Sequence, residues 1–322
     1  MPLELRQLRY FIATAEDLSF SRAARRLRLA QPALSQQIKH LEEELEARLF
    51  TRNSRGVQLT AAGERLLAQA RAIVEQVALL PAAVKDDDSE VHGEVRIGLP
   101  GTVSEVLAVP LITACRARHP HVRIKVVEAM SGYIRDWLIG GGIDLAVLYS
   151  SAEAAADGLA MHQVLTEEVC LFAVPALIPP GGPGGTLPFA ALSALQLILP
   201  GRAHGLRELV ERAADGAGIS LSVAFEIDSY GQIKELAAQG LGCGLLPRRT
   251  VQREAAGGQF DVRQIVDPVL KRKIFLVWPD RRPVARATAA VSTLAWETLR
   301  ALVASGRWSA TLSESEAAPA IR

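Results

Sequence analysis

Apolar residues recur at helical spacing in three successive segments at the start of the chain. This periodicity predicts three short amphipathic helices that bury one face each. The second is expected to begin at Ser19 as its N-cap, and the third near Pro32, because proline suits a first helical turn. The few residues 28–30 between them predict the tight connection of a helix-turn-helix. The three stripes are Leu5, Leu8, Ile12 and Ala15; Phe20, Ala23, Ala24 and Leu27; and Leu34, Ile38, Leu41 and Leu45.

The outer face of the third helix is short and polar. Pro32, Gln36 and Lys39 lie opposite its apolar stripe, with Ser35 on the flank. Such side chains can bond to base edges and phosphates in a DNA major groove. After the helix, residues 53–59 form a turn and a short extended segment, a wing that would carry Arg52 and Arg55 toward DNA. The pattern predicts a winged helix-turn-helix over residues 1–60.

A longer helix follows, from Thr60, and its apolar residues alternate at spacings of four and three. The stripe is Leu59, Gly63, Leu66, Ala70, Ile73, Val77 and Leu80. This spacing is typical of a coiled-coil seam and predicts a dimer joined through Leu66, Ala70, Ile73 and Val77. The alternative is that the stripe packs on its own chain. Pro81 ends or kinks the helix, and residues 85–89 indicate a solvated hinge, so residues 61–91 form a linker.

From Glu94 onward, short apolar strands alternate with helices. This alternation predicts mainly parallel sheets covered by helices, so the fold class is α/β with a helical N-terminal domain. We expect one domain over residues 92–302 with two lobes, the first from 92–164 and 269–302 and the second from 165–268. Residues 303–322 are rich in Ser, Ala and Glu, and we expect a disordered tail.

Four of the predicted strands end in polar turns that begin helices. In parallel sheets these turns meet at a ligand crevice, where helix N-termini favour an anion. The expected ligand is therefore a small organic anion. The candidate contacts are Gly101, Thr102, Ser104, Ser131, Arg202, His204 and Ser229. The hydroxyls could instead be simple N-caps, and Arg202 could face solvent.

Composition narrows the class of protein. The chain has 322 residues, enough for two or three domains, and a formal net charge of +1, which excludes a uniformly basic nucleic-acid binder. A local basic stretch at residues 18–40 contains no acid, although on charge alone a solvated helix surface would explain it.

No signal peptide or membrane span is predicted, and three widely spaced cysteines fit the reducing cytoplasm. Cys243 could be a redox sensor or an inert core thiol.

No enzyme motif, cofactor fingerprint or metal-ligand spacing follows any predicted strand, so we expect no catalytic activity, cofactor or metal. The competing hypothesis is a solute-binding or catalytic α/β protein with an incidental helical N-terminus. Sequence-preferring, salt-dependent DNA binding would separate the two hypotheses.

The N-terminal sequence closely resembles LysR-type transcriptional regulators over about 65 residues. The matching runs are Leu8-Arg9-Tyr10-Phe11, Ser19-Phe20-Ser21-Arg22-Ala23-Ala24, Gln31-Pro32-Ala33-Leu34-Ser35-Gln36-Gln37-Ile38, Leu41-Glu42, Leu49-Phe50-Thr51-Arg52 and Leu59-Thr60-Ala61-Ala62-Gly63. The chain departs from the family at two interhelical turns. Glu46 stands where the family usually has glycine, and Leu18 where it has a small or polar residue.

The resemblance implies that Gln31, Pro32, Ser35, Gln36 and Lys39 approach bases or adjacent phosphates and that Arg52 reaches the DNA backbone. It also implies a two-lobed effector domain resembling periplasmic binding proteins. Implied partners are double-stranded operator DNA, a small effector and further copies of the chain as a dimer and then a tetramer. RNA polymerase is a candidate partner.

Overall fold

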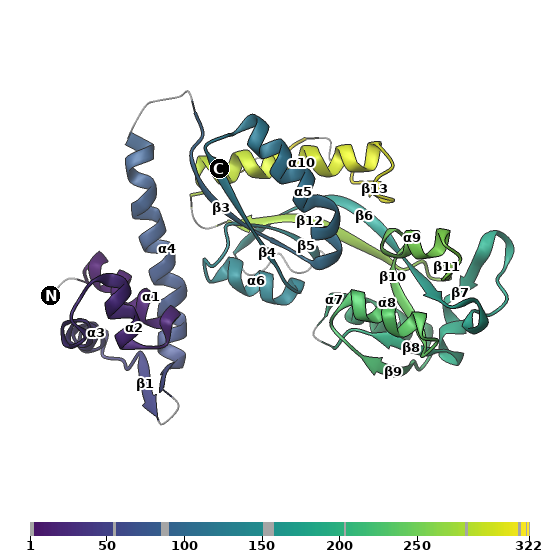
Figure 1. The fold of residues 1–322 in the computed structure, drawn as a ribbon, viewed down its shortest axis with the longest axis horizontal. Coiled ribbons are helices and arrows are strands. Elements are labelled where there is room, and N and C mark those ends of the chain that lie inside the picture. Colours follow the sequence, from purple (N-terminus) through teal and green to yellow (C-terminus); the bar gives the residue numbers. More distant parts are fainter. Residues whose placement is uncertain are drawn as a thin grey trace.

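The computed structural model describes residues 3–53, 56–84, 90–150, 158–202, 204–280, 283–314, 317–319 and 321. At its N-terminal end, α1 (Leu5–Asp17), α2 (Phe20–Leu27) and α3 (Gln31–Glu44) precede an antiparallel pair, β1 (Phe50–Asn53) and β2 (Gly56–Leu59). Figure 1 shows these elements together at one end of the long linker helix. The predicted winged helix-turn-helix is confirmed.

Aromatic packing holds this small domain together. The Phe50 ring, at the start of the wing, lies 5.4 Å from the Phe11 ring and 5.7 Å from the Phe20 ring, measured between centroids. The Glu42 carboxylate accepts hydrogen bonds from the backbone N–H groups of Leu49 (2.7 Å) and Phe50 (3.2 Å) and so fixes the wing to α3. Leu45, expected in the buried stripe, is 38% exposed because α3 ends at Glu44.

Both departures from the family pattern fall where the backbone is left-handed. Leu18 has φ 46° and Glu46 has φ 50°. A side chain in this conformation costs about 1–2 kcal/mol, whereas glycine adopts it freely. The chain therefore carries backbone strain at the turn between α3 and the wing, where a glycine would relieve it.

Glu46→Gly is expected to stabilise the N-terminal domain by about 1 kcal/mol, since it removes this strain. Glu46→Ala is the matched control, because it removes the same carboxylate and keeps a Cβ. Urea unfolding of the full chain, followed through the N-terminal transition, measures both variants. Equal stability of the glycine and alanine variants would show that the turn is unstrained.

The linker helix α4 (Ala61–Val84) begins at a capped turn. The Thr60 hydroxyl accepts a hydrogen bond from Gly63 N (3.0 Å) and donates one to Arg48 O (2.6 Å). At Gly63 any Cβ would lie 2.3 Å from the carbonyl oxygen of Leu49, so the helix approaches the wing at a distance that only glycine allows.

The predicted seam of α4 divides into two parts. Ala70 is fully buried in the core of its own N-terminal domain, and Leu66 packs partly against the same core. Ile73 and Leu80 are 44% and 57% exposed, and Val77 is half-buried. The assignment of Ala70 to a dimer seam is therefore wrong, because its side chain is already covered within one chain. Ile73 and Val77 stay available to a second chain.

The rest of the chain forms two lobes on one continuous sheet, in the order β4-β3-β5-β12-β6-β10-β8-β9 (Figure 1). The first lobe contains β3 (Gly93–Leu99), α5 (Gly101–Arg118), β4 (Val122–Glu128), α6 (Ser131–Ile139), β5 (Leu145–Ser150) and α10 (Arg286–Ala304). The second contains β7 (Thr186–Pro188), β8 (Gln196–Leu199), α7 (Gly205–Ala217), β9 (Ser222–Glu226), α8 (Tyr230–Ala238), β10 (Cys243–Pro247), α9 (Gln252–Ala256) and β11 (Asp261–Val266).

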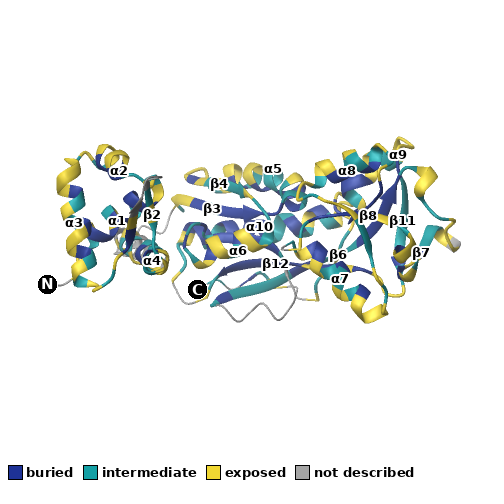
Figure 2. Cartoon of the chain, turned by 90° about the horizontal axis from the view of Figure 1, so that it is seen from below, coloured by how far each residue is buried: buried dark blue, intermediate teal, exposed yellow. Residues whose placement is uncertain are grey.

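Two long strands connect the lobes, β6 (Leu159–Ala173) and β12 (Lys271–Pro279), and they pair with each other antiparallel. The expectation of mainly parallel sheets holds for β3, β4 and β5 and for β8, β9 and β10, but β6 and β12 run against their neighbours. Each lobe has its own apolar core. Figure 2 shows buried residues concentrated along the strands.

The C-terminal segment is ordered where the structure describes it, so the prediction of a disordered tail is wrong for that part. Trp308 is 2% exposed and packs in the first lobe's core. Beyond it, β13 (Thr311–Leu312) pairs antiparallel with β6, and Ser313 N donates to Val164 O at 2.8 Å. The Ser, Ala and Glu content of residues 303–322 suggested disorder, because composition does not show that a single buried residue, Trp308, fixes this segment to the core.

Candidate DNA interface and interlobe cavity

Helix α3 exposes the polar face predicted from its sequence. Leu34, Ile38 and Leu41 are buried against α1 and α2, so the opposite face points outward. Gln31, Pro32, Gln36 and Lys39 are exposed, and Ser35 is half-buried. The amide of Gln31 donates to the Ser35 hydroxyl at 3.1 Å. Ser35, Gln36 and Lys39 line a shallow hollow of about 550 Å³ together with Arg48.

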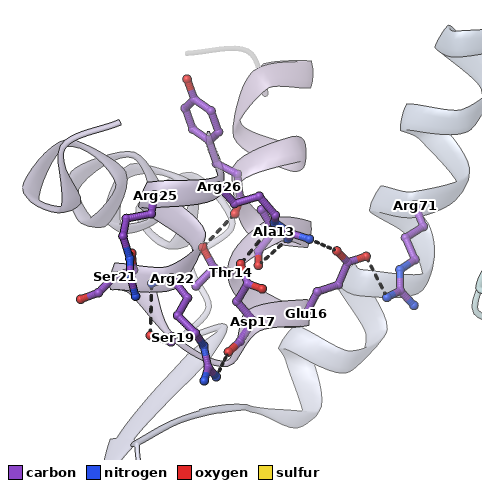
Figure 3. A network of polar contacts seen from close by, with 11 residues as sticks. Ala13, Thr14, Glu16, Asp17, Ser19, Ser21, Arg22, Arg25, Arg26 and Arg71 are labelled. Carbon is purple, nitrogen blue, oxygen red and sulfur yellow. Dashed lines mark hydrogen bonds and ion pairs between the residues drawn. The ribbon is translucent and has the colours of Figure 1, made fainter. Parts of the chain in front are cut away.

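Most arginines of the acid-free stretch are already bonded within the domain. Arg26 pairs with Glu16 (3.0 Å) and Asp17 (3.2 Å), and Glu16 also pairs with Arg71 of α4 at 3.3 Å (Figure 3). Arg22 donates to the carbonyl oxygen of Asp17. These contacts link α1, α2 and the linker helix, so part of the basic stretch positions the domain. Lys39, paired only loosely with Glu43 at 3.4 Å and 73% exposed, is better placed for a phosphate.

The two arginines assigned to the wing are less completely defined. Arg52 lies in β1, opposite Val57 of β2, and its side chain is outside the described part of the structure. Arg55 lies outside the described residues.

A cavity of about 260 Å³ lies between the two lobes of the larger domain. Four of the predicted ligand contacts line it, namely Gly101, Thr102, His204 and Ser229. Ser104 and Ser131 are not among its lining residues, although Ser131 directly follows the lining residue Met130. Five further polar residues line it that were not among the candidates from the sequence: Glu128, Tyr149, Asp228, Tyr230 and Arg272.

Arg272 is the central cation of the cavity. It lies at the start of β12 and is 7% exposed, with its guanidinium 2.7 Å from the Glu167 carboxylate. Its Nη2 also lies 3.1 Å from the Tyr149 hydroxyl and 3.4 Å from the Thr102 hydroxyl, and its Cζ lies 3.7 Å from the centroid of the Tyr149 ring. Arg272 thereby joins a cavity wall to the connecting strand β6.

The polar network continues beyond Arg272 in both directions. The hydroxyls of Thr102 and Tyr149 lie 2.7 Å apart, and burial raises the pKa of Tyr149, with the Arg272 charge opposing that rise. On the other side, Trp308 Nε1 donates to Glu167 at 2.9 Å. A buried carboxylate is tolerable when it is both paired and hydrogen-bonded, as Glu167 is. Trp308, in the C-terminal segment, thus stabilises the carboxylate that pairs with Arg272, the cation of the cavity.

The two cations predicted from the sequence do not charge the cavity. Arg202 is absent from its lining, is 80% exposed and lies 3.8 Å from Glu211. His204 Nδ1 accepts a hydrogen bond from Leu206 N (3.1 Å), which caps α7. Burial, together with Arg272, lowers the pKa of His204, and Asp228 offsets this only in part. These influences and the capping role of Nδ1 favour the neutral imidazole over the positive charge expected from the sequence.

The cavity combines backbone donors with carboxylate acceptors, and the first lobe contributes both kinds of group. The first turn of α5, at Gly101 and Thr102, presents backbone N–H groups that have no partner within the helix. Glu128 and Asp228 add carboxylates, and Asp228 accepts from Gly201 N at 2.9 Å. At Gly101 a Cβ would lie 2.9 Å from the Tyr230 ring of the second lobe, so the two lobes approach closely there, and 3.2 Å from Glu128 of the first lobe.

The three cysteines are buried and free. Burial raises the pKa of Cys115 and raises the pKa of Cys170 and Cys243 to about 11. A thiol must ionise to react readily, so these environments favour the interpretation of Cys243 as an inert core residue.

Models of two protein families match the chain. The "LysR substrate binding domain" covers residues 88–299, and the "Bacterial regulatory helix-turn-helix protein, lysR family" covers residues 5–64. The chain belongs to the LysR family of transcriptional regulators. It is therefore a DNA-binding transcriptional regulator, as the N-terminal resemblance predicted.

Individual LysR-type regulators match this chain almost from end to end. The nitrogen assimilation regulatory protein nac of Escherichia coli is 30% identical over 293 residues, which cover 91% of this chain and 94% of the relative. The solved structure of a full-length OxyR variant from Pseudomonas aeruginosa has a TM-score of 0.77 at 23% identity and covers 98% of this chain and 100% of its own. Full-length CbnR complexed with its target DNA has a TM-score of 0.51 at 23% identity, covering 92% and 99%.

No helix in the described ranges is long and apolar enough to cross a lipid bilayer.

Proposed function

We propose that this LysR-type regulator binds operator DNA through α3 and that a small organic effector in the interlobe cavity changes that binding. The observation that carries the proposal is the cavity itself, which both lobes line and which Arg272 charges. A ligand that contacts both lobes stabilises one relative arrangement of them, and such a shift in population is how a bound molecule changes a distant site.

The cavity's chemistry supports a small acid that also carries a donor group. The N-terminal turn of α5, with Arg272 and the Thr102 and Tyr149 hydroxyls, suits a carboxylate. Glu128 and Asp228 suit an ammonium or hydroxyl group. Arg272 is already paired with Glu167, so a dianion would meet little uncompensated positive charge. An amino acid or hydroxy acid therefore fits better than the plain organic anion predicted from sequence.

The exposed part of the linker helix supports a homodimer. Ile73 and Leu80 are apolar and exposed, and their spacing continues the predicted seam. Such a dimer would place two α3 helices on two operator half-sites. We extend the proposal to a tetramer built from two such dimers, to a cytoplasmic location, and to RNA polymerase as the partner at the promoter. We propose no catalytic activity and no cofactor.

A thermal-shift screen of the full chain tests the effector class. Amino acids and hydroxy acids are expected to raise the melting temperature, whereas simple amines and simple carboxylic acids are expected to have smaller effects. A ligand at 100 times its dissociation constant stabilises by about 2.7 kcal/mol. Thr102→Val should abolish the shift, because it removes the hydroxyl beside Arg272, while Arg202→Ala should leave it intact. A shift that survives Thr102→Val would place the ligand elsewhere.

Gln36→Ala is expected to reduce discrimination between operator and scrambled DNA by about 1–3 kcal/mol, because it removes a side chain able to pair with a base edge. Lys39→Ala should weaken binding to both DNAs alike and lower the slope of log affinity against log salt by about one. Fluorescence anisotropy at several salt concentrations measures both effects. If Lys39→Ala lost specificity and Gln36→Ala did not, the two roles would be reversed.

A further inference from the structure

Two histidines and a glutamate converge where the chain enters the larger domain. Glu90 Oε2 lies 3.0 Å from His121 Nε2 and 3.8 Å from His92 Nε2. One ligand atom from each residue lies within 4.8 Å of those of the other two. The three side chains are 56%, 50% and 63% exposed for Glu90, His121 and His92, so an ion could reach them from solvent.

The sheet holds the two imidazoles side by side. Gly93 of β3 pairs with Val122 of β4 in a parallel ladder, so His92 and His121 occupy equivalent positions one residue before that pair. Gly93 N also donates to His121 O at 3.3 Å. The two imidazole rings are 4.8 Å apart between centroids, with an interplanar angle of 31°.

The two glutamate–histidine separations are close to those of a metal centre. Zinc binds histidine nitrogen and carboxylate oxygen at about 2.0–2.2 Å, so two ligands of a tetrahedral ion lie about 3.4 Å apart. The observed 3.0 and 3.8 Å fall on either side of this value. Two imidazoles and one carboxylate favour zinc, copper, nickel or cobalt, whereas calcium and magnesium prefer a shell of oxygens.

We propose that Glu90, His92 and His121 bind a divalent transition-metal ion of the zinc class, with water in the remaining position. The sequence predicts no such site, because the two histidines are far apart in the chain and are brought together only by strand pairing. Glu90 is the first described residue after the linker helix and residues 85–89. The ion would tie this residue to the starts of β3 and β4 and so restrain the path between the DNA-binding and effector domains.

Metal titration of the full chain without an affinity tag tests the site. After treatment with a chelator, Zn²⁺ is titrated in a calorimeter, and Co²⁺ is followed by the visible absorption of its tetrahedral complexes. We expect one equivalent to bind. His92→Ala and His121→Ala should weaken binding at least tenfold, and Glu90→Gln should weaken it less. His119→Ala is the matched control, since His119 lies two residues from His121 and outside the cluster.

All substituted positions of the cluster are exposed, so each variant is expected to keep the melting temperature of the metal-free wild type. Absence of stoichiometric binding by the wild-type chain would overturn the proposal. Equal binding by the wild type, His92→Ala and His121→Ala would also overturn it, because the ion would then lie elsewhere. Weaker metal binding by His119→Ala alone would overturn it as well, because the ion would then lie outside the cluster.

Discussion

Arg272→Met is expected to lower the free energy of unfolding of the effector domain by about 3–5 kcal/mol. The substitution leaves the carboxylate of Glu167, which is 3% exposed, without its guanidinium partner. The indole of Trp308 would still donate to it, but it carries no charge. An unpaired buried charge is among the most destabilising changes a core can undergo. Urea unfolding monitored by tryptophan fluorescence measures the loss.

Two further variants separate the buried pair from general effects of substitution in β12. Lys273→Met changes an exposed neighbour on the same strand and should alter stability by no more than about 0.5 kcal/mol. The double variant Arg272→Met with Glu167→Gln should be more stable than Arg272→Met alone, since no unpaired charge remains. If the double variant lost the sum of the losses measured for Arg272→Met alone and Glu167→Gln alone, the two residues would not be coupled.

Ile73→Asp is expected to convert the proposed dimer into monomers. Ile73 is 44% exposed in one chain, so the substitution costs the isolated chain little. In a dimer seam the same carboxylate would be buried without a partner, at a cost of at least several kcal/mol. Each 1.4 kcal/mol is a tenfold change in the dissociation constant, so dimerisation should weaken more than about a hundredfold. Sedimentation velocity measures the shift, and affinity for a two-half-site operator should fall with it.

Ala78→Asp provides the control for the linker helix. Ala78 is exposed on the same helix, about 140° around the axis from Ile73 at ~100° per residue, so a carboxylate there stays in solvent. Ala78→Asp is therefore expected to remain dimeric. Ile73→Asp should also retain the thermal shift with effector, which shows that the larger domain is folded. An oligomeric Ile73→Asp protein with unchanged operator affinity would contradict the seam.

Local pattern was enough to predict most of the elements and the N-terminal domain. The stripe of α3 placed Gln36 and Lys39 on the outer face, because helical geometry alone decides which residues lie opposite Leu34 and Ile38. The same reasoning went wrong at Ala70. Periodicity identifies an apolar face, but it does not say whether that face packs on its own domain or on a second chain.

The cavity was harder to predict because strand pairing across long sequence distances builds it. Gly101 and Thr102 were found from the turn that follows β3, since such turns begin helices at the carboxyl edge of a sheet. Arg272 was missed because Lys271-Arg272-Lys273 appears as an ordinary basic strand end. The apolar run that follows, Ile274 to Trp278, is buried throughout, so its pattern does not tell which of the three basic side chains points inward.

The proposed function requires a specific operator and a response to an effector in the interlobe cavity. Both properties are measured together by fluorescence anisotropy with DNA from the chain's own upstream promoter region, with and without a ligand found by thermal shift. We expect binding at least about 10³ times tighter than to scrambled DNA of the same length, and a change in that affinity when ligand is added. Equal affinity for both DNAs, unaltered by ligand, would contradict the proposed function.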